Sequence, residues 1–70
     1  MIDDSKTKVE VKGRITIKYF YNKDSELLGF TTRNADGDVY FDVWDYDGSY
    51  IDTVKTINDA KRILELKNIA

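Results

Sequence analysis

Alternating hydrophobic and polar positions run through most of the chain, and they predict strands. The first alternating run extends from Val9 to Tyr21 and predicts one long strand with an apolar and a charged face. The apolar face comprises Val9, Val11, Ile15, Ile17, Tyr19 and Tyr21, and the charged face comprises Lys8, Glu10, Lys12, Arg14, Thr16 and Lys18. Gly13 predicts a bend, a bulge or the point where pairing begins. Phe20 falls on the charged face and is expected to reach over a neighbouring strand or into a partner.

The segments on either side of this run are more polar. Residues 1–8 are expected to form a frayed N-terminus, which leaves residues 9–70 as a single domain. Residues 26–32 are predicted to form a strand because of their Gly-Phe-Thr-Thr ending, although their two leucines would also suit the start of a helix. Residues 34–38 contain an Asp-Gly pair and predict a hairpin loop.

Residues 39–54 carry two runs of β-branched and aromatic residues around a second Asp-Gly pair, which predicts a hairpin. Two registers are open. A two-residue turn pairs Trp44 with Ile51, whereas a type I turn with Gly48 in the left-handed region pairs Trp44 with Tyr50. We favour the second register because it sorts the side chains more cleanly. It places Val39, Phe41, Val43 and Ile51 on a core face, and Tyr40, Asp42, Trp44, Tyr50, Asp52 and Val54 on the opposite face.

The period changes after Val54, and a helix is predicted from Ile57 to about Asn68. Thr56 occupies the N-cap position and Asp59 follows three residues later, as in a capping box with Asp in place of Glu. The stripe expected to pack on the sheet comprises Ile57, Ala60, Ile63, Leu64 and the stem of Lys67. Leu66 and Ile69 lie off this stripe, either as exposed surface or as a subunit contact. The predicted fold class is α+β: an antiparallel meander of three or four strands with one C-terminal helix on one face.

The length of 70 residues allows only a thin core, and the absence of Cys excludes disulfides and thiolate metal sites. Oligomerisation is therefore the expected source of additional stability. The absence of Cys fits a reducing compartment. No apolar run resembles a signal peptide or a membrane span, so we expect a cytoplasmic protein without a membrane partner.

The residue types leave little room for catalysis. The absence of His excludes Ser-His-Asp triads, His/Cys metal sites and histidine general bases. Asp42 and Asp52 are the only candidate acid–base pair, and we favour the interpretation that they are two solvated carboxylates on an exposed sheet face, because a single small sheet offers little concavity to raise a carboxylate pKa. The two Asp-Gly loops lack the bidentate Glu that a calcium loop needs at its twelfth position. We therefore predict no enzymatic activity, no metal and no cofactor.

Charge is unevenly distributed within a net charge of −2. Residues 34–54 hold six Asp and no Lys or Arg, whereas the segments on either side are mildly basic. This pattern raises two alternative functions. One is nucleic-acid binding by Lys12, Arg14 and Lys18 on the first strand. The other is inhibition of a DNA-handling protein by an acidic hairpin that imitates phosphates.

Several segments resemble one known family. These are Gly29-Phe30, the run from Val43 to Gly48, Tyr50-Ile51 and the run from Thr56 to Lys61. In these segments the chain resembles the Yopt family, small Bacillus prophage proteins of unknown function. The resemblance implies three strands and one helix per subunit, assembled as a homodimer, and it brings no catalytic residues.

The predicted function is a small, non-enzymatic, dimeric protein-interaction module of prophage type, with a host or phage protein as a further partner. Large aromatic residues supply much of the energy in such contacts. The predicted interface comprises Tyr40, Trp44, Tyr50, Leu66 and Ile69.

Overall fold

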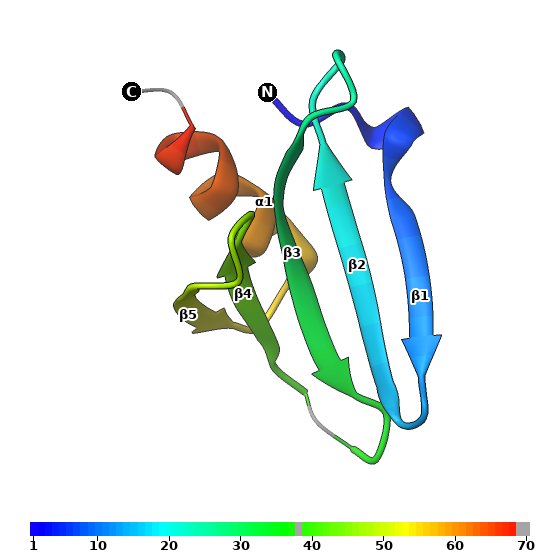
Figure 1. Cartoon of the computed structure of the whole chain (residues 1–70). Helices are drawn as coiled ribbons and strands as arrows, with labels where there is room; N and C mark the ends of the chain where they lie inside the picture. The colour runs from blue at the N-terminus through cyan, green and yellow to red at the C-terminus, as the bar shows by residue number, and fades with distance from the viewer. Residues whose placement is uncertain (38, 69–70) are drawn as a thin grey trace.

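A computed structural model of the chain describes residues 1–37 and 39–68. It contains a five-stranded antiparallel sheet, whose strands lie in sequence order, and one C-terminal helix (Figure 1). The elements are η1 (Asp4–Lys6), β1 (Lys8–Lys12), β2 (Ile15–Tyr21), β3 (Leu27–Asn34), β4 (Phe41–Asp45), β5 (Tyr50–Val54) and α1 (Ile57–Lys67). The predicted α+β class is confirmed, and the sheet has more strands than the three or four predicted.

The additional strand comes from a turn at Gly13. The predicted single strand is instead the hairpin β1–β2, in which Lys12 pairs with Ile15 and Gly13 has a φ of +61°. A side chain rarely adopts this left-handed conformation, whereas glycine does so without steric cost. The turn pairs odd-numbered positions with even-numbered ones, so Val11 lies opposite Thr16. The valines of β1 therefore share a face with the polar positions of β2, contrary to the prediction.

The hairpin between β4 and β5 has the predicted register at its turn. Trp44 pairs with Tyr50, and Gly48 has a φ of +89°. A bulge follows on β5, because Val43 pairs with Asp52 and leaves Ile51 as an extra residue. Beyond the bulge Val54 pairs with Phe41, so the prediction that Val54 lies on the Trp44 face was wrong. Because of the extra residue, Asp52, Thr53 and Val54 each lie on the face opposite to the one that simple alternation predicts.

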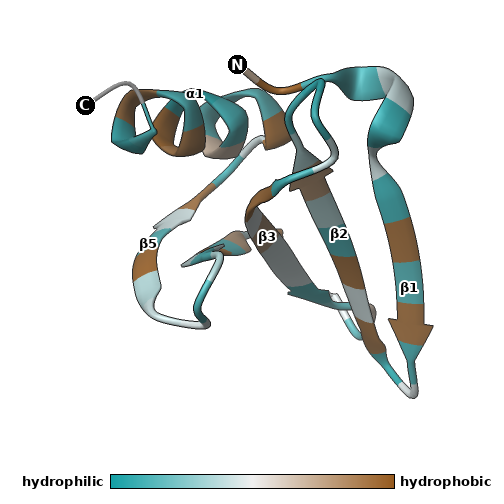
Figure 2. Cartoon of the chain, turned by 45° about the horizontal axis from the view of Figure 1, so that its top comes forward, coloured by the Kyte–Doolittle hydropathy of each residue, from teal (hydrophilic) through white to brown (hydrophobic). Residues whose placement is uncertain are grey.

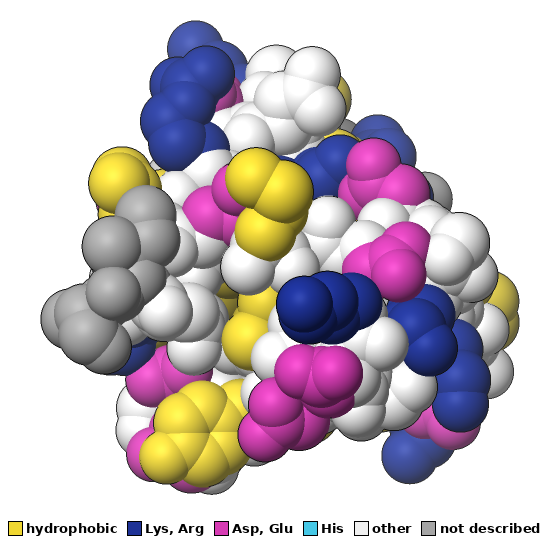
Figure 3. Space-filling view, turned by 90° about the horizontal axis from the view of Figure 1, so that it is seen from above, with side chains coloured by type: hydrophobic (Ala, Val, Ile, Leu, Met, Phe, Trp, Pro, Cys, Tyr) yellow, Lys and Arg dark blue, Asp and Glu magenta, His cyan; other side chains and the backbone are white. Residues whose placement is uncertain are grey.

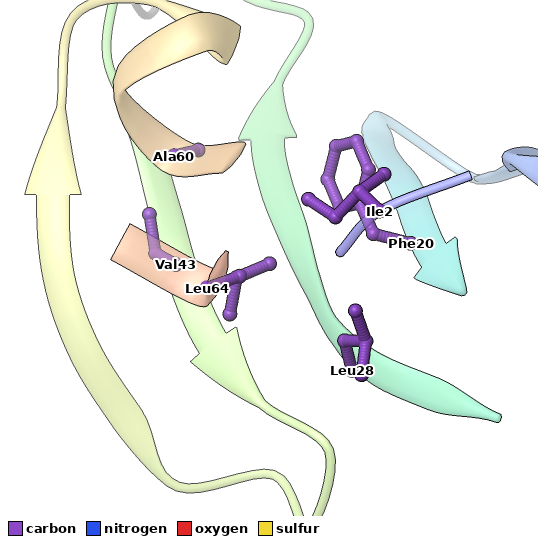
Figure 4. Close-up of a cluster of buried hydrophobic side chains, with 6 residues drawn as sticks. All are labelled: Ile2, Phe20, Leu28, Val43, Ala60 and Leu64. Atoms are coloured by element: carbon purple, nitrogen blue, oxygen red, sulfur yellow. The ribbon is translucent and has the colours of Figure 1, made fainter. Parts of the chain in front are cut away.

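Helix α1 packs against β3, β4 and β5 on one face of the sheet, which we call the helix side (Figures 1 and 2). Six apolar side chains form the buried core on this side of the sheet (Figure 4). They are Ile2, Phe20, Leu28, Val43, Ala60 and Leu64. The helix begins after Thr56, whose hydroxyl accepts a hydrogen bond of 3.1 Å from the backbone N–H of Asp59, as predicted.

Two residues depart from their predicted environments and enter this core. Phe20, which was expected to reach over a neighbouring strand or into a partner, is only 1% exposed and is buried on the helix side. Ile2, in the segment predicted to be frayed, is also buried, and the backbone N–H of Asp3 donates to the carbonyl of Tyr21 at 2.8 Å. Because the helix covers only β3 to β5, the N-terminal segment supplies the apolar cover over Phe20 (Figure 4).

Gly29 on β3 allows the helix to approach the sheet closely. A methyl group at this position would clash with the side chain of Leu64 and would lie 2.6 Å from the carbonyl oxygen of Trp44. Leu64 is completely buried at this contact. Gly29 is therefore part of the packing of the core, because it supplies the space that Leu64 fills.

Candidate interaction face

The face of the sheet opposite α1 forms a second large surface, which we call the open face. No described helix or loop lies over it (Figures 1 and 2). The register places on it Lys8, Glu10 and Lys12 of β1, Ile15, Ile17, Tyr19 and Tyr21 of β2, Phe30, Thr32 and Asn34 of β3, Asp42 and Trp44 of β4, and Tyr50 and Thr53 of β5. Half of these side chains are half-buried by their neighbours, among them Tyr19, Phe30 and Trp44, and the other half are exposed, including Ile15 at 44% and Tyr50 at 56%.

Four aromatic rings cross the open face in one row, with one ring from each of the strands β2 to β5. The ring centroids of Tyr19 and Phe30 are 5.8 Å apart, and those of Phe30 and Trp44 are 6.2 Å apart and nearly parallel. Trp44 then meets Tyr50 edge to face at 5.5 Å. Each ring lies directly opposite the next across paired strands, where side chains approach most closely. These four residues form the aromatic row.

The polar atoms around the aromatic row are hydrogen-bonded within the face. The indole Nε1 of Trp44 donates to the hydroxyl of Thr32 at 2.8 Å. The Thr53 hydroxyl donates to the Asp42 carboxylate at 2.7 Å and lies 2.6 Å from the Tyr50 hydroxyl. These bonds lower the cost of removing the face from water, because the polar atoms keep their partners when the face is covered.

The hydroxyl of Tyr19 is also hydrogen-bonded within the open face, to a residue of β1. This hydroxyl donates to a carboxylate oxygen of Glu10 at 3.2 Å. Partial burial, followed by the negative charge of Glu10, raises the pKa of Tyr19 above its ordinary value of 10.0. The phenol is therefore protonated at neutral pH and remains a hydrogen-bond donor to Glu10.

The formal charges on the open face cancel. Lys8 and Lys12 are balanced by Glu10 and Asp42. The Lys8 amine lies 5.5 Å from the centre of the Tyr21 ring, and the Lys12 amine lies 3.5 Å from Glu10. Both lysines belong to β1 and Asp42 belongs to β4, so the face is more positive toward one edge of the sheet and more negative toward the other.

The structure brings together two of the five residues predicted for the interface, Trp44 and Tyr50. Tyr40 precedes β4 and is exposed, without a ring contact to either of them. Leu66 is exposed on α1, across the sheet from the aromatic row. Ile69 lies outside the described residues.

Tyr19 and Phe30 belong to the aromatic row but are not among the five residues predicted from the sequence. Tyr19 was part of an apolar alternation, and Phe30 lay in the segment with the most ambiguous secondary structure. The pairing of the strands is the signal that identifies these two residues. Once the register is known, Tyr19 lies opposite Phe30 and Phe30 lies opposite Trp44.

The residues of the nucleic-acid alternative do not form a strip. Lys12 lies on the open face, whereas Lys18 lies on the helix side, because Lys18 pairs with Thr31 and Val9. Arg14 lies in the turn between β1 and β2, where its guanidinium is 2.6 Å from the carboxylate of Asp36. The predicted basic face of one long strand is therefore divided between two sides of the sheet.

The acidic block is divided in a similar way. Asp36 lies in the loop after β3 and Asp47 in the loop after β4, and these loops lie at opposite ends of the sheet (Figure 1). Asp45 is nearly buried and forms an ion pair of 3.3 Å with Lys67. Figure 3, viewed from the end that holds both termini, shows acidic and basic side chains interspersed.

The candidate catalytic pair is also separated. Asp42 shares the open face with Trp44, whereas the bulge on β5 sets Asp52 opposite Val43, a helix-side residue. The described residues hold no group of three or more side chains suited to a metal ion, and none of their helices is long and apolar enough to span a membrane. No family model, curated protein or solved structure matches the chain, so the Yopt-like resemblance stays a prediction.

Proposed function

We propose that the chain is a non-enzymatic interaction module whose open face binds a second copy of the same chain. The observation that carries this proposal is the aromatic row, whose polar atoms already have hydrogen-bond partners within the face. Rigid aromatic side chains in such a setting gain free energy when water is excluded and lose few hydrogen bonds.

The same features favour a protein partner over a nucleic acid. A surface that stacks bases needs an excess of positive charge along the phosphate path, and its polar groups must be free to read base edges. On the open face the charges of Lys8, Lys12, Glu10 and Asp42 cancel. The Trp44 indole N–H is bonded to Thr32 and is not free to contact a base.

The charge distribution supports a second copy as the partner. In a face-to-face dimer with its two-fold axis along the strands, β1 of one copy lies over β5 of the other. Lys8 then lies near the ring of the partner's Tyr50, where a cation–π contact is favourable. An axis across the strands would instead set β1 against β1, with their lysines facing each other. The first arrangement is electrostatically self-complementary and closed.

The size of the open face predicts a weak dimer. Five strands about 4.8 Å apart, with about five residues at about 3.3 Å each, span roughly 24 by 17 Å. This is roughly 400 Å² of projected area per copy, which is at the low end of specific interfaces. A dissociation constant in the micromolar range is therefore expected.

The test is sedimentation equilibrium of the chain from about 1 to 500 μM, with the mass compared with the monomer mass of 8.1 kDa. Two matched pairs of variants separate the faces. Ile15→Lys changes the open face and Val11→Lys changes an exposed valine on the helix side. Tyr50→Lys changes the aromatic row, whereas Tyr46→Lys changes an exposed tyrosine of the β4–β5 turn that borders Leu28.

We expect the wild-type mass to rise toward that of a dimer, and the two open-face variants to weaken association at least about tenfold, because each buries an unpaired ammonium group. Val11→Lys and Tyr46→Lys should stay within about twofold of wild type. Circular dichroism checks that all four variants fold. A monomer at every concentration, or equal effects of both members of each pair, would overturn the proposal. Salt-sensitive binding of a single-stranded oligonucleotide by that monomer would assign the face to nucleic acid.

A further inference from the structure

Strand β1 forms one edge of the sheet, and no described element lies beyond it (Figure 1). All of its residues are exposed, and its pairing with β2 runs from Lys8 to Lys12 without a bulge. The other edge differs, because β5 carries the bulge at Ile51 and contacts α1. A bulge twists an edge away from further pairing, so β1 is the edge better able to accept another strand.

The backbone groups of Val9 and Val11 point away from the sheet. The carbonyl of Arg14 accepts a hydrogen bond of 2.7 Å from the backbone N–H of Ala35, on the side of β3. Because ladder bonds alternate along a strand, the odd-numbered residues of β2 bond toward β1, where their partners are even-numbered. The N–H and C=O groups of Val9 and Val11 therefore point outward, which is the direction from which main-chain hydrogen bonds hold an added strand.

The charged side chains of β1 are held over the open face. The Lys8 amine lies 5.5 Å from the centre of the Tyr21 ring on β2. The Lys12 amine lies 3.5 Å from Glu10, which in turn accepts from the hydroxyl of Tyr19 on β2. Lysines on an edge strand commonly oppose pairing. In β1 these contacts direct them over the sheet, so they select the charge of an added strand and leave the backbone accessible.

The two valines give the same edge an apolar side. Val9 and Val11 lie on the helix side of the sheet and are 58% and 67% exposed. A strand with apolar residues at alternate positions would cover both valines, because alternate side chains of a paired strand lie on one face. The β1 edge thus combines outward backbone groups, an apolar side and a basic-acidic-basic row of charges.

A second copy of β1 does not match this edge. Antiparallel pairing through the outward groups of both valines in each copy sets Lys8 opposite the partner's Lys12 and Glu10 opposite the partner's Glu10. Like charges directly opposite each other are destabilising. A register shifted by two residues instead sets a valine opposite the partner's Thr7 or the partner's Gly13, which lie outside the strand. The charges therefore favour a different sequence as the partner.

We propose that the β1 edge binds an extended segment of another protein, which pairs antiparallel to β1 and adds a strand to the sheet. The segment alternates apolar and charged residues. Its acidic residues lie opposite Lys8 and Lys12, and its apolar residues lie opposite Val9 and Val11. Main-chain hydrogen bonds supply the affinity and the alternating side chains supply the selectivity. The outward groups lie in the plane of the sheet, so this site goes beyond the proposed dimer.

The test is a titration of the full-length, ¹⁵N-labelled chain with short blocked peptides, followed by two-dimensional NMR and hydrogen exchange at about 50 and 200 mM salt. The matching probe is Thr-Glu-Val-Lys-Val-Glu-Thr. One control peptide, Thr-Lys-Val-Glu-Val-Lys-Thr, inverts its charges. A second control, Thr-Glu-Val-Lys-Pro-Glu-Thr, removes one backbone donor.

Two double variants of the chain test the charges of the edge. Lys8→Glu with Lys12→Glu inverts the basic charges of β1. Lys23→Glu with Lys55→Glu is the matched control, because it changes the net charge equally at exposed positions outside β1.

The matching peptide should produce saturable shifts at the amides of Val9 and Val11 and should slow their hydrogen exchange. It should bind the wild-type chain at least about fivefold more tightly than either control peptide. The variant Lys8→Glu with Lys12→Glu should reverse the preference between the two charged peptides, whereas the matched control should keep it. The higher salt concentration should reduce the preference, because these charges are exposed.

The proposal would be overturned by unchanged Val9 and Val11 amides up to about 5 mM peptide, or by shifts confined to the open face. Equal binding of the two charged peptides by the wild type would also overturn it. Slower exchange at these amides as the protein concentration rises, without peptide, would assign the edge to a second copy instead. Sedimentation equilibrium of the wild-type chain tests the open-face dimer separately, so the two proposals can fail independently.

Discussion

The two faces of the sheet bury hydrophobic surface in different ways. On the helix side, small residues allow close packing: Gly29 of β3 and Ala60 of α1 lie next to Leu64, which is completely buried. On the open face the residues are large, and the aromatic row covers its strands without a second layer. The helix side holds a buried core beneath α1, whereas the aromatic row of the open face still contacts water.

The difference also appears in the polar groups. On the helix side, Asp45 is nearly buried and is paired with Lys67 of the helix, so an ion pair links the two layers. On the open face, Trp44 and Thr32 are paired within one layer. Polar groups that bind across layers fix the position of α1, and polar groups that bind within a layer leave the aromatic row free to meet another surface.

The largest expected effect comes from filling the space at Gly29. Gly29→Ala places a methyl group against Leu64 and 2.6 Å from the Trp44 carbonyl oxygen, so α1 must move away from the sheet. We expect a loss of about 3 kcal/mol in the free energy of unfolding, measured by urea denaturation. Gly13→Ala is the control, because it meets no atom within 4 Å and costs about 1 kcal/mol through its φ of +61°. Equal stability of the two variants would contradict the close packing at Gly29.

A smaller effect is expected on the open face. Thr32→Val keeps the shape of the side chain but removes the acceptor of the Trp44 indole N–H. The expected loss is about 1 kcal/mol in the free energy of unfolding, and it should vanish in a Trp44→Phe background, which lacks that donor. A double-mutant cycle measures the coupling. Thr16→Val, on the helix side, should be nearly neutral. A coupling close to zero would show that the bond does not hold Trp44 in the row.

The smallest effect is expected at Asp47, in the turn that belongs to neither face. Hydrogen bonds from the backbone N–H and then the hydroxyl of Ser49 lower the pKa of Asp47 below its ordinary value of 3.8. The folded state therefore favours the ionised form, and this contribution to stability is present above about pH 4 and is lost as the pH falls through the lowered pKa.

The check is a comparison of wild type with Asp47→Asn by thermal unfolding between about pH 2 and 7. The wild type should show a small advantage near neutral pH that disappears at the acid end, because protonation removes the charge that the variant lacks at every pH. An advantage that does not change with pH would exclude this origin.

The sequence predicted the features that depend on local chemistry. The Thr56 cap, the apolar stripe of α1 and the pairing of Trp44 with Tyr50 all follow from neighbouring residues, and the structure confirms them. The errors arose where one residue reverses the alternation: the turn at Gly13 and the bulge at Ile51. Each changes the face of every position beyond it, and alternation alone does not locate such a reversal.

The sequence also did not determine which face of β2 the core covers. Tyr19 and Phe20 are adjacent, both are large and aromatic, and either suits a buried position. The decision depends on Gly29, which pairs with Phe20 and leaves room for the helix on that side, and on Ile2, which covers the ring. Ile2 is distant in sequence from Phe20, and Gly29 carries no side chain. The pattern of residues around Phe20 therefore does not reveal either of them.

The order of the strands has a consequence for how the chain folds. Every strand of the sheet pairs with the next one along the chain, so each pairing closes only a short loop and loses little conformational entropy. Such local topology favours rapid folding for a β-rich protein, and hairpins can form before the helix docks. The chain also contains no proline, so refolding has no slow isomerisation step. The meander therefore suits a protein that completes its sheet quickly, so that the inner strands are without their partners only briefly during folding.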